Sequence, residues 1–321
     1  MEFPIELRIM SEKLVEGISG SELAEDAKEL SRRYMNESGT GKSLLNRDKE
    51  ATVYSIMRMP ATFGAVSAAL EQICQTSDFV PRSLLDAGAG TGAGSWAATS
   101  YFAIDKITCL EREMAMENIG KLFMKESTDK ALNEAMWINT DLSEDFGDKY
   151  KSDLVIASYV LNEMSTEERI RVADRLWDNT NQMLLIVEPG TPAGYRNIIA
   201  IRQHLLERGA YIAAPCPHSD KCKLEEDDWC HFTCRVQRGK LHKLVKNANV
   251  PYEDEKYAYI AFSKEPCNIP ENRIMRHPIV EKGRIRLTVC TRDNKVMERT
   301  VTKSQGEQYK KAKKAACGDS L

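Results

Sequence analysis

The chain has 321 residues, enough for one sizeable hydrophobic core with appended parts. Hydrophobic residues make up 42% and charged residues 29% of the chain, a balance that excludes an intrinsically disordered protein. It contains no run of about 18 apolar residues and begins with no apolar signal segment. We therefore expect neither a membrane-spanning helix nor export.

Charge is distributed unevenly along the chain. The formal net charge is −3, but the segment from Glu271 to the end contains 13 Lys and Arg against 6 Asp and Glu. A basic region on an acidic body favours a surface that binds polyanions. The alternative is a solvated helix whose lysines face only water.

Residues 1–80 form a predicted N-terminal helical region. Apolar side chains recur at helical spacing between Ile5 and Val15 and again through Ala61–Ile73. We expect Pro60 to open the second of these helices in its first turn, where a missing N–H is tolerated.

Strands and helices alternate after Pro81. The expected strands are Ser83–Asp86, Lys106–Leu110, Met136–Asn139, Asp153–Ser158 and Met183–Val187. A helix follows the first strand through Trp96, and another covers Tyr195–Glu207. This order predicts an α/β core in residues 81–212 with a mostly parallel, Rossmann-like sheet.

The last third of the chain is less regular. An irregular, cysteine-rich stretch runs from Ala213 to about Val236, and we assign residues 213–256 to an insertion. Strand signals return at Tyr257–Phe262 and Arg284–Thr291, so we assign residues 257–300 to the final strands of the core. Residues 301–321 form a basic tail with a lysine-rich helix.

A glycine-rich turn, Asp86–Gly92, follows the first strand, where open α/β sheets bind ligands. Gly88, Gly90 and Gly92 allow the backbone to approach a ligand, although Gly88, Gly90 and Ala93 also fit the dinucleotide pattern. The carboxylate of Asp86 would repel a pyrophosphate. It suits the cationic methionine end of S-adenosylmethionine.

Two further acids extend this site. Glu111 ends the second strand, where a carboxylate can accept hydrogen bonds from both ribose hydroxyls. Asp141 follows the third strand and is placed to meet the adenine amine. Three acids at successive strand ends predict a class I, S-adenosylmethionine-dependent methyltransferase fold. The alternative is that Glu111 and Asp141 are solvated loop acids.

No group that would activate a methyl acceptor is evident. The fourth strand continues into Ser158–Glu163, which lacks the Asp/Asn-Pro-Pro-Tyr motif that holds an amine for N-methylation. The sequence therefore identifies no catalytic residue.

The nine cysteines are unevenly placed along the chain. With no export signal we expect a reducing compartment, where thiols bind metal or stay free. Cys216, Cys222, Cys230 and Cys234 fall within 19 residues. Their spacing matches neither a short zinc knuckle nor a ferredoxin run, and it leaves zinc and an iron–sulfur cluster both open. The candidates for a fourth ligand are Cys234, His218, His231 and Cys290.

Nearly the whole chain resembles the methyltransferase-like assembly factors of the mitochondrial small ribosomal subunit and their prokaryotic relatives. The Cys-Pro-His and Asp-Trp-Cys-His-Phe segments are the most specific. The matching segments are Ser31–Tyr34, Arg58–Thr62, Asp86–Gly92, Leu161–Glu163, Glu188–Gly194, Cys216–His218, Asp228–Phe232, Tyr257–Tyr259 and Tyr309–Asp319.

The resemblance implies a structural [4Fe–4S] cluster on four cysteines. The ligands carried over residue by residue are Cys216, Cys222, Cys230 and Cys290. Cys234 stands where relatives commonly have another residue, and we treat it as a bystander. No role is assigned to Cys317.

The resemblance also implies a role on the RNA of the small ribosomal subunit during its assembly. Lysines of the basic tail then have phosphates to meet, and these are Lys303, Lys310, Lys311, Lys313 and Lys314. Arg32, Arg33 and Arg58 are weaker candidates for the same contacts.

Three functions follow from these patterns. The first is an S-adenosylmethionine-binding, iron–sulfur assembly factor that is monomeric away from the ribosome. The second is an active RNA methyltransferase, in which Asn162 and Glu163 border the acceptor pocket. The third is a small-molecule methyltransferase with a zinc insertion. The expected location is the cytoplasm of a prokaryote, or the mitochondrial matrix if the chain is a processed eukaryotic protein.

Overall fold

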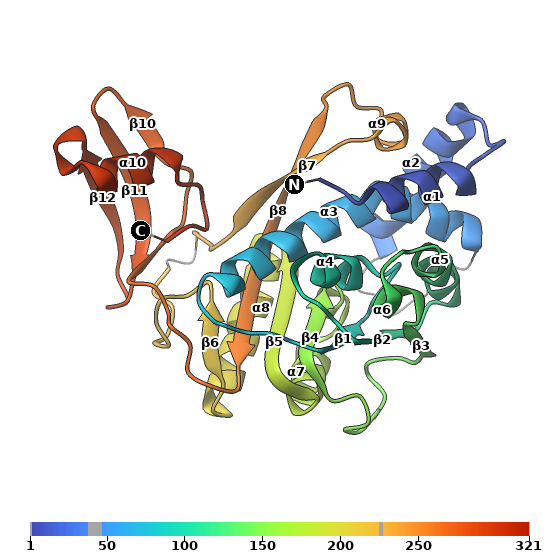
Figure 1. The fold of residues 1–321 in the computed structure, drawn as a ribbon, viewed down its shortest axis with the longest axis horizontal. Helices are drawn as coiled ribbons and strands as arrows, with labels where there is room; N and C mark the ends of the chain where they lie inside the picture. The colour runs from blue at the N-terminus through green and yellow to red at the C-terminus, as the bar shows by residue number, and fades with distance from the viewer. Residues whose placement is uncertain (1, 38–46, 225–226, 321) are drawn as a thin grey trace.

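The computed structural model describes residues 2–37, 47–224 and 227–320 (Figure 1). Its helices are α1 (Ile5–Leu14), α2 (Gly20–Glu37), α3 (Asp48–Cys74), α4 (Ala93–Tyr101), α5 (Met114–Lys125), α6 (Lys130–Asn133), α7 (Thr166–Asp178), α8 (Pro192–Glu207), α9 (Lys240–Val245) and α10 (Glu307–Lys314), with short 3₁₀ turns η1 (Leu161–Glu163) and η2 (Lys303–Gln305). Its strands are β1 (Ser83–Ala87), β2 (Lys106–Glu111), β3 (Met136–Asn139), β4 (Ser152–Ser158), β5 (Thr180–Pro189), β6 (Tyr211–Ala214), β7 (Phe232–Gln237), β8 (Tyr252–Ser263), β9 (Asn272–Ile274), β10 (Ile279–Glu281), β11 (Arg284–Thr291) and β12 (Val296–Thr302).

The core sheet has the strand order β3-β2-β1-β4-β5-β8-β6. Strands β1 to β5 pair in parallel, whereas β8 runs antiparallel to both β5 and β6. This is the arrangement of a class I methyltransferase fold, and it confirms the predicted mostly parallel sheet. The strands are near-continuous apolar runs because helices cover both faces.

Each face of the sheet has its own hydrophobic layer. Side chains of α3, α4 and α5 pack on one face, and those of α7 and α8 pack on the other. Helix α3 crosses the first face, and α1 and α2 lie against its outer side (Figure 1). The N-terminal helices are therefore part of the main core, and α3 lies beside the carboxyl ends of the parallel strands.

The prediction for Pro60 was wrong. Helix α3 is continuous from Asp48 to Cys74, with Pro60 in its interior rather than its first turn. An interior proline costs a helix about 3 kcal/mol through the missing hydrogen bond and a clash with the preceding turn. Side chains on both sides of the proline, including Ile56, Met59 and Phe63, are buried in the main core, and their packing offsets that cost.

A long hairpin, which we call the arm, extends β8 beyond the sheet. The first half of β8 pairs with β7, and α9 at the tip packs against α2 and α3. Glu253 accepts a hydrogen bond from Lys246 at 2.6 Å and lies 3.1 Å from His242. Burial opposes ionisation of Glu253, but the bonds from His242 and Lys246 outweigh it and hold its pKa far below the usual range.

The C-terminal lobe consists of β9 to β12 and α10. These strands form a second sheet of order β10-β11-β12, with β9 on β11. Of the strands from β8 to β12, only β8 belongs to the core sheet. The assignment of residues 257–300 to core strands was therefore wrong beyond β8. The basic tail is also not free, because α10 packs on β11 and β12 over a small core of its own. Alternating apolar residues predict a strand, but they do not say which strand will be its partner.

Within the described residues, no helix is both long and apolar enough to cross a membrane.

Candidate functional site

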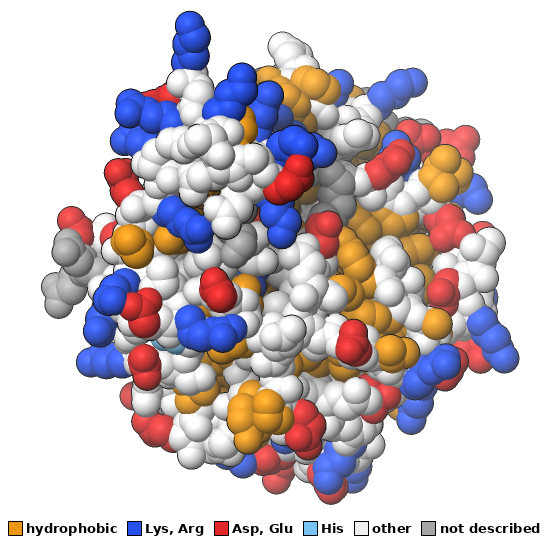
Figure 2. All heavy atoms as spheres, turned by 60° about the vertical axis from the view of Figure 1, so that its left-hand side comes forward, with side chains coloured by type: hydrophobic (Ala, Val, Ile, Leu, Met, Phe, Trp, Pro, Cys, Tyr) orange, Lys and Arg blue, Asp and Glu red, His pale blue; other side chains and the backbone are white. Residues whose placement is uncertain are grey.

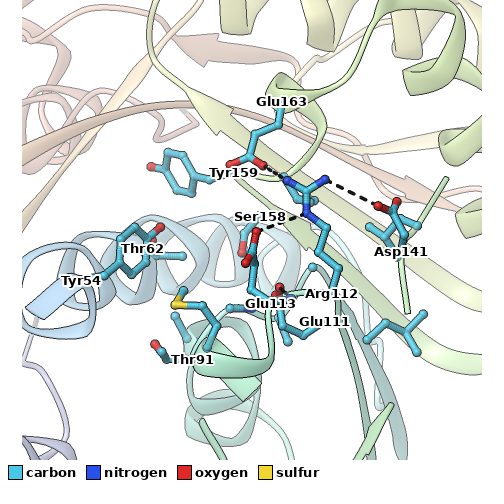
Figure 3. A pocket seen from close by; sticks show the side chains of 18 of the residues that line it. Tyr54, Thr62, Thr91, Glu111, Arg112, Glu113, Asp141, Ser158, Tyr159 and Glu163 are labelled. Atoms are coloured by element: carbon cyan, nitrogen blue, oxygen red, sulfur yellow. Dashed lines mark hydrogen bonds and ion pairs between the residues drawn. The ribbon is translucent and has the colours of Figure 1, made fainter. Parts of the chain in front are cut away.

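A pocket opens at the carboxyl ends of the parallel strands, and we call it the strand-end pocket. Its floor is the turn after β1, and α3 forms the opposite wall (Figure 3). The residues that line it include Tyr54, Met59, Thr62, Gly88–Thr91, Leu110–Glu113, Thr140–Leu142, Ser158–Val160, Glu163 and Met164. Gly88, Gly90, Glu111 and Asp141, all predicted from the sequence, lie on this pocket, whereas Asp86 and Gly92 do not line it.

The turn after β1 requires glycine. Gly88 has a φ of +66°, and a Cβ there would lie 2.5 Å from Cγ2 of Val160. Gly90 and Gly92 also have positive φ, and Gly92 is the left-handed residue that precedes α4. Backbone N–H groups of the turn and the start of α4 therefore lie close to the pocket.

Asp86 lies beneath the turn, fully buried. Its Oδ2 accepts hydrogen bonds from the backbone N–H and the hydroxyl of Ser95, both at 2.8 Å. Burial raises the pKa of Asp86 to about 7. In the structure, then, Asp86 holds the start of α4 and shapes the turn.

Glu111 ends β2 and is held in place by two backbone donors. Its Oε2 accepts from Gly90 N at 2.7 Å, and its Oε1 accepts from Glu113 N at 2.9 Å. Burial raises the pKa of Glu111 to about 7, against the opposing effect of these two hydrogen bonds. A carboxyl group fixed in this way can accept further hydrogen bonds from hydroxyl groups of a ligand.

Arg112 lies across the pocket among three carboxylates (Figure 3). Its guanidinium is 3.3 Å from Glu163, 3.6 Å from Asp141 and 3.7 Å from Glu113. Although partial burial opposes it, hydrogen bonds from Ser143 and Arg112 lower the pKa of Asp141. Asp141 and Glu163 thus both line the pocket, and each forms an ion pair with Arg112. Asn162 does not line the pocket.

Tyr159 is a site residue that the sequence reasoning missed. It follows β4 with a φ of +58°, a strained backbone for a residue of this size. Its hydroxyl donates to Oε1 of Glu255 at 3.0 Å, and Arg58 donates to the same oxygen at 3.3 Å. This network joins the pocket to the arm, and it gives Arg58 a partner inside the protein. Its position after β4 was the only available signal.

The predicted cysteine ligands surround a second cavity, the cysteine cavity. Cys216 follows β6, Cys222 lies in the loop beyond it, Cys230 precedes β7, and Cys290 is on β11. All four line the same cavity. Burial raises the pKa of Cys290 to about 12 and that of Cys230 well above its usual range.

Polar groups approach two of these sulfurs. Tyr195 donates its hydroxyl to Sγ of Cys222 at 3.3 Å, and Nε2 of His218 lies 3.5 Å from Sγ of Cys290. In the described ranges, no three His, Cys, Asp or Glu side chains are grouped closely enough to hold one metal ion. A single zinc ion with bonds of about 2.3 Å to sulfur requires such a group.

Of the other candidate ligands, His218 also lines the cysteine cavity, whereas Cys234 and His231 lie elsewhere. Cys234 is buried on β7, where its sulfur would lie 3.3 Å from a Cβ added to Gly64 of α3. His231 stacks near Trp229, and the Cys317 thiol donates to the carbonyl of Met275 at 3.2 Å. Cys234, His231 and Cys317 do not line the cysteine cavity.

All five lysines predicted to contact RNA are exposed in the C-terminal lobe. Lys310 pairs with Glu307 at 2.6 Å. Lys and Arg side chains gather over the upper part of the face in Figure 2, which brings the C-terminal lobe forward. Arg32 and Arg33 instead pair with Glu29 and Glu50 at 2.7 and 2.8 Å.

The sequence profile of the family described as mitochondrial small ribosomal subunit Rsm22 matches residues 48–321. The chain belongs to this Rsm22 family. It is 24% identical over 286 residues to the human protein named ribosome assembly protein METTL17, mitochondrial. That alignment covers 84% of this chain and 62% of the human protein, so the chain spans about three fifths of that relative's length.

Solved methyltransferase structures are similar to the chain of this Rsm22 family member. Magnesium protoporphyrin IX methyltransferase from Synechocystis PCC 6803, with bound S-adenosylmethionine, superposes with a TM-score of 0.44 and 16% identity, over 74% of this chain and 97% of that one. The plantazolicin methyltransferase in complex with S-adenosylhomocysteine gives a TM-score of 0.42 and 14% identity, over 80% and 100% of the two chains.

Proposed function

We propose that this protein is a small-subunit ribosome assembly factor that binds S-adenosylmethionine in the strand-end pocket and an iron–sulfur cluster in the cysteine cavity. The observation that carries the proposal is the meeting of Cys216, Cys222, Cys230 and Cys290 around one cavity in a chain of the Rsm22 family. The name of the human relative, a mitochondrial ribosome assembly protein, supports the assembly role.

The donor set fits an iron–sulfur cluster. Four thiols, contributed by separate segments, line one cavity. A cluster places its iron atoms between the sulfurs and therefore tolerates wider spacing than a zinc ion does. When bound, the cluster supplies cross-links between residues 216–230 and β11. These residues join the insertion to the C-terminal lobe, so the cluster has a structural role.

Support for S-adenosylmethionine comes from the chemistry of the strand-end pocket. Gly88 and Gly90 allow close backbone approach, Glu111 would accept hydrogen bonds from ribose hydroxyls, and Asp141 would accept one from the adenine amine. The segment Ser158–Glu163 at this pocket lacks the motif that holds an amine for N-methylation. The role proposed for the pocket is therefore ligand binding, and methylation of ribosomal RNA is the alternative that a transfer assay distinguishes.

RNA binding is assigned to the exposed lysines of the C-terminal lobe, which can meet phosphates without reading sequence. The site of action is the compartment in which small subunits mature, the mitochondrial matrix in a eukaryote or the cytoplasm in a prokaryote. Away from the ribosome the protein acts as a monomer.

Anaerobic purification tests the cluster. The full-length protein should be brown and contain about four iron and four sulfide per chain. Cys290→Ser should lose most of both, whereas Cys234→Ser, a buried cysteine outside the cavity, should retain them. Stoichiometric zinc without sulfide would contradict the cluster. Transfer of tritium from labelled cofactor to ribosomal RNA would replace the binding role with an enzymatic one.

A further inference from the structure

Two arginines are buried in the wall of the cysteine cavity. Arg202, on α8, is 2% exposed, and Arg273, on β9, is 1% exposed. They rank first and second among the largest fully buried side chains of the described residues. Both line the cavity together with the four cysteines. Arginine is almost never this deeply buried unless its charge is paired.

Among the described residues, the two guanidinium groups donate hydrogen bonds to neutral oxygens, and Arg202 also interacts with the thiol of Cys216. Arg202 Nη2 donates to the carbonyls of His218 and Asp220 at 2.9 and 2.8 Å. Arg273 donates from Nε to the carbonyl of Pro215 at 2.8 Å, and from Nη1 to the carbonyl of Gly318 at 2.6 Å and to the side-chain oxygen of Gln72. Nε of Arg202 and Nη2 of Arg273 have no hydrogen-bond partner among the described residues.

Neither guanidinium forms a salt bridge with a carboxylate in the part of the chain that the structure describes. Two positive charges buried in the wall of one cavity are unfavourable unless a negative charge lies between them. The cavity that they line contains four cysteines, and cysteine binds metal as the thiolate. Four thiolates around an iron–sulfur core carry a net negative charge in the same space.

We propose that Arg202 and Arg273 are the charge partners of the cluster, which they hold by balancing its negative charge and whose reduction potential they raise. This inference rests on the proposed function, because it requires the cluster to be present. Nearby positive charge stabilises the reduced state, which is the more negative one, and outer groups of this kind tune metal centres. The two arginines are positioning residues, since they act through the cluster and its ligands.

Arg202→Gln and Arg273→Gln test the proposal in the full-length, anaerobically purified protein. Each should shift the midpoint potential of the cluster to a more negative value and increase the rate of iron loss in air several-fold. Arg169→Gln is the matched control. Arg169 is 8% exposed on α7 and also donates to backbone carbonyls, those of Leu161 and Met164, but it does not line the cavity. The control should keep the wild-type potential and iron content.

Arg202→Lys provides a second test that depends on charge alone. The introduced ammonium loses its proton at high pH, whereas a guanidinium does not. The reduction potential of this variant should therefore fall as the pH rises toward about 10. The reduction potential of the wild type should not show this fall, because its guanidinium keeps its charge.

The outcomes separate the two proposals. A wild-type protein without iron and sulfide overturns the proposed function itself. A wild-type protein with a normal cluster, but with Arg202→Gln and Arg273→Gln matching Arg169→Gln in potential and iron loss, overturns only the charge-partner inference. A potential of Arg202→Lys that tracks the wild type at every pH overturns it as well, even if a glutamine variant fails to fold.

Discussion

Glu111 and Asp86 are two buried carboxyl groups with a pKa near 7 and different surroundings. Glu111 lines the strand-end pocket, whereas Asp86 lies below it and binds Ser95. A ligand hydroxyl that donates to Glu111 favours the ionised form of the carboxyl group. We therefore expect binding of S-adenosylmethionine to strengthen about tenfold between pH 6 and pH 8, with release of a proton.

Titration calorimetry at several pH values, in buffers of different ionisation enthalpy, measures the binding affinity and the number of protons released. Glu111→Gln should weaken binding by at least about tenfold, roughly 1.4 kcal/mol, and abolish the pH dependence. Glu126→Gln, an exposed position after α5, is the control and should behave as the wild type. An affinity that is flat with pH in the wild type would remove Glu111 from the binding site.

Asp86 gives a separate prediction for the ligand-free protein. Its pKa is raised in the folded state, so between about pH 4 and pH 7 the folded chain binds more protons than the unfolded one. This contribution to stability is fully present below about pH 4 and is lost as the pH rises through 7. Asp86→Asn keeps an acceptor for Ser95 without the charge. Its melting temperature should therefore fall less between pH 6 and pH 8 than that of the wild type, and an equal fall would contradict the assignment.

At the scale of the element, the arm depends on close packing against α3. Gly64 of α3 faces the arm, and a Cβ there would lie 2.5 Å from Cγ2 of Val236 and 3.3 Å from the sulfur of Cys234. Gly64→Ala should therefore destabilise the fold by about 1–3 kcal/mol through overpacking. Gly239→Ala is the matched control at the tip of the arm, where φ is −68° and nothing lies within 4 Å of the added Cβ. Chemical unfolding of both variants measures the difference, and equal stability would mean that the arm yields without cost.

Elements with a strong local pattern could be predicted from the sequence. Short-range signals mark the glycines of the turn after β1 and the apolar strands β1, β2 and β4. The positions of these elements, and of the acid at the end of β2, could therefore be predicted. Strand β7 and α9 have no such signal, because the arm is stabilised by packing against α3, which is distant in sequence. Tyr159 was missed for the same reason, since its partners Arg58 and Glu255 come from opposite parts of the chain.

At the scale of the whole molecule, the C-terminal lobe and the cysteine cavity depend on pairing that no local pattern encodes. Arg273 connects α3, the segment after β6 and the C-terminal end of the chain through Gln72, Pro215 and Gly318. The composition of the chain gives no reason to bury this arginine. The cysteine set could be named from the family resemblance, but the charged wall around it could be seen only once the fold had brought these segments together.

The lysines of α10 lie on the outside of the C-terminal lobe. Ala312 is buried against β11 and β12, while Lys311, Lys313 and Lys314 are exposed. Reversing these three charges to glutamate should leave the lobe folded, because its packing uses other side chains. It should also weaken the association with small-subunit particles and reduce the salt dependence of binding by about one unit of slope for each phosphate that is no longer neutralised.

Sedimentation of the tagged protein from anaerobic lysate through sucrose gradients at two salt concentrations provides the measurement. The control reverses Lys28, Lys106 and Lys125, three exposed lysines outside the C-terminal lobe, and matches the change in net charge. The wild type and the control should migrate with small subunits at low salt, whereas the α10 variant should stay near the top. If both triple variants lose their association with small subunits to the same extent, the binding is due to general electrostatic attraction and not to a specific basic surface. If the wild type itself stays at the top, the ribosome is not its partner, and small-molecule acceptors become the next ligands to test in the strand-end pocket.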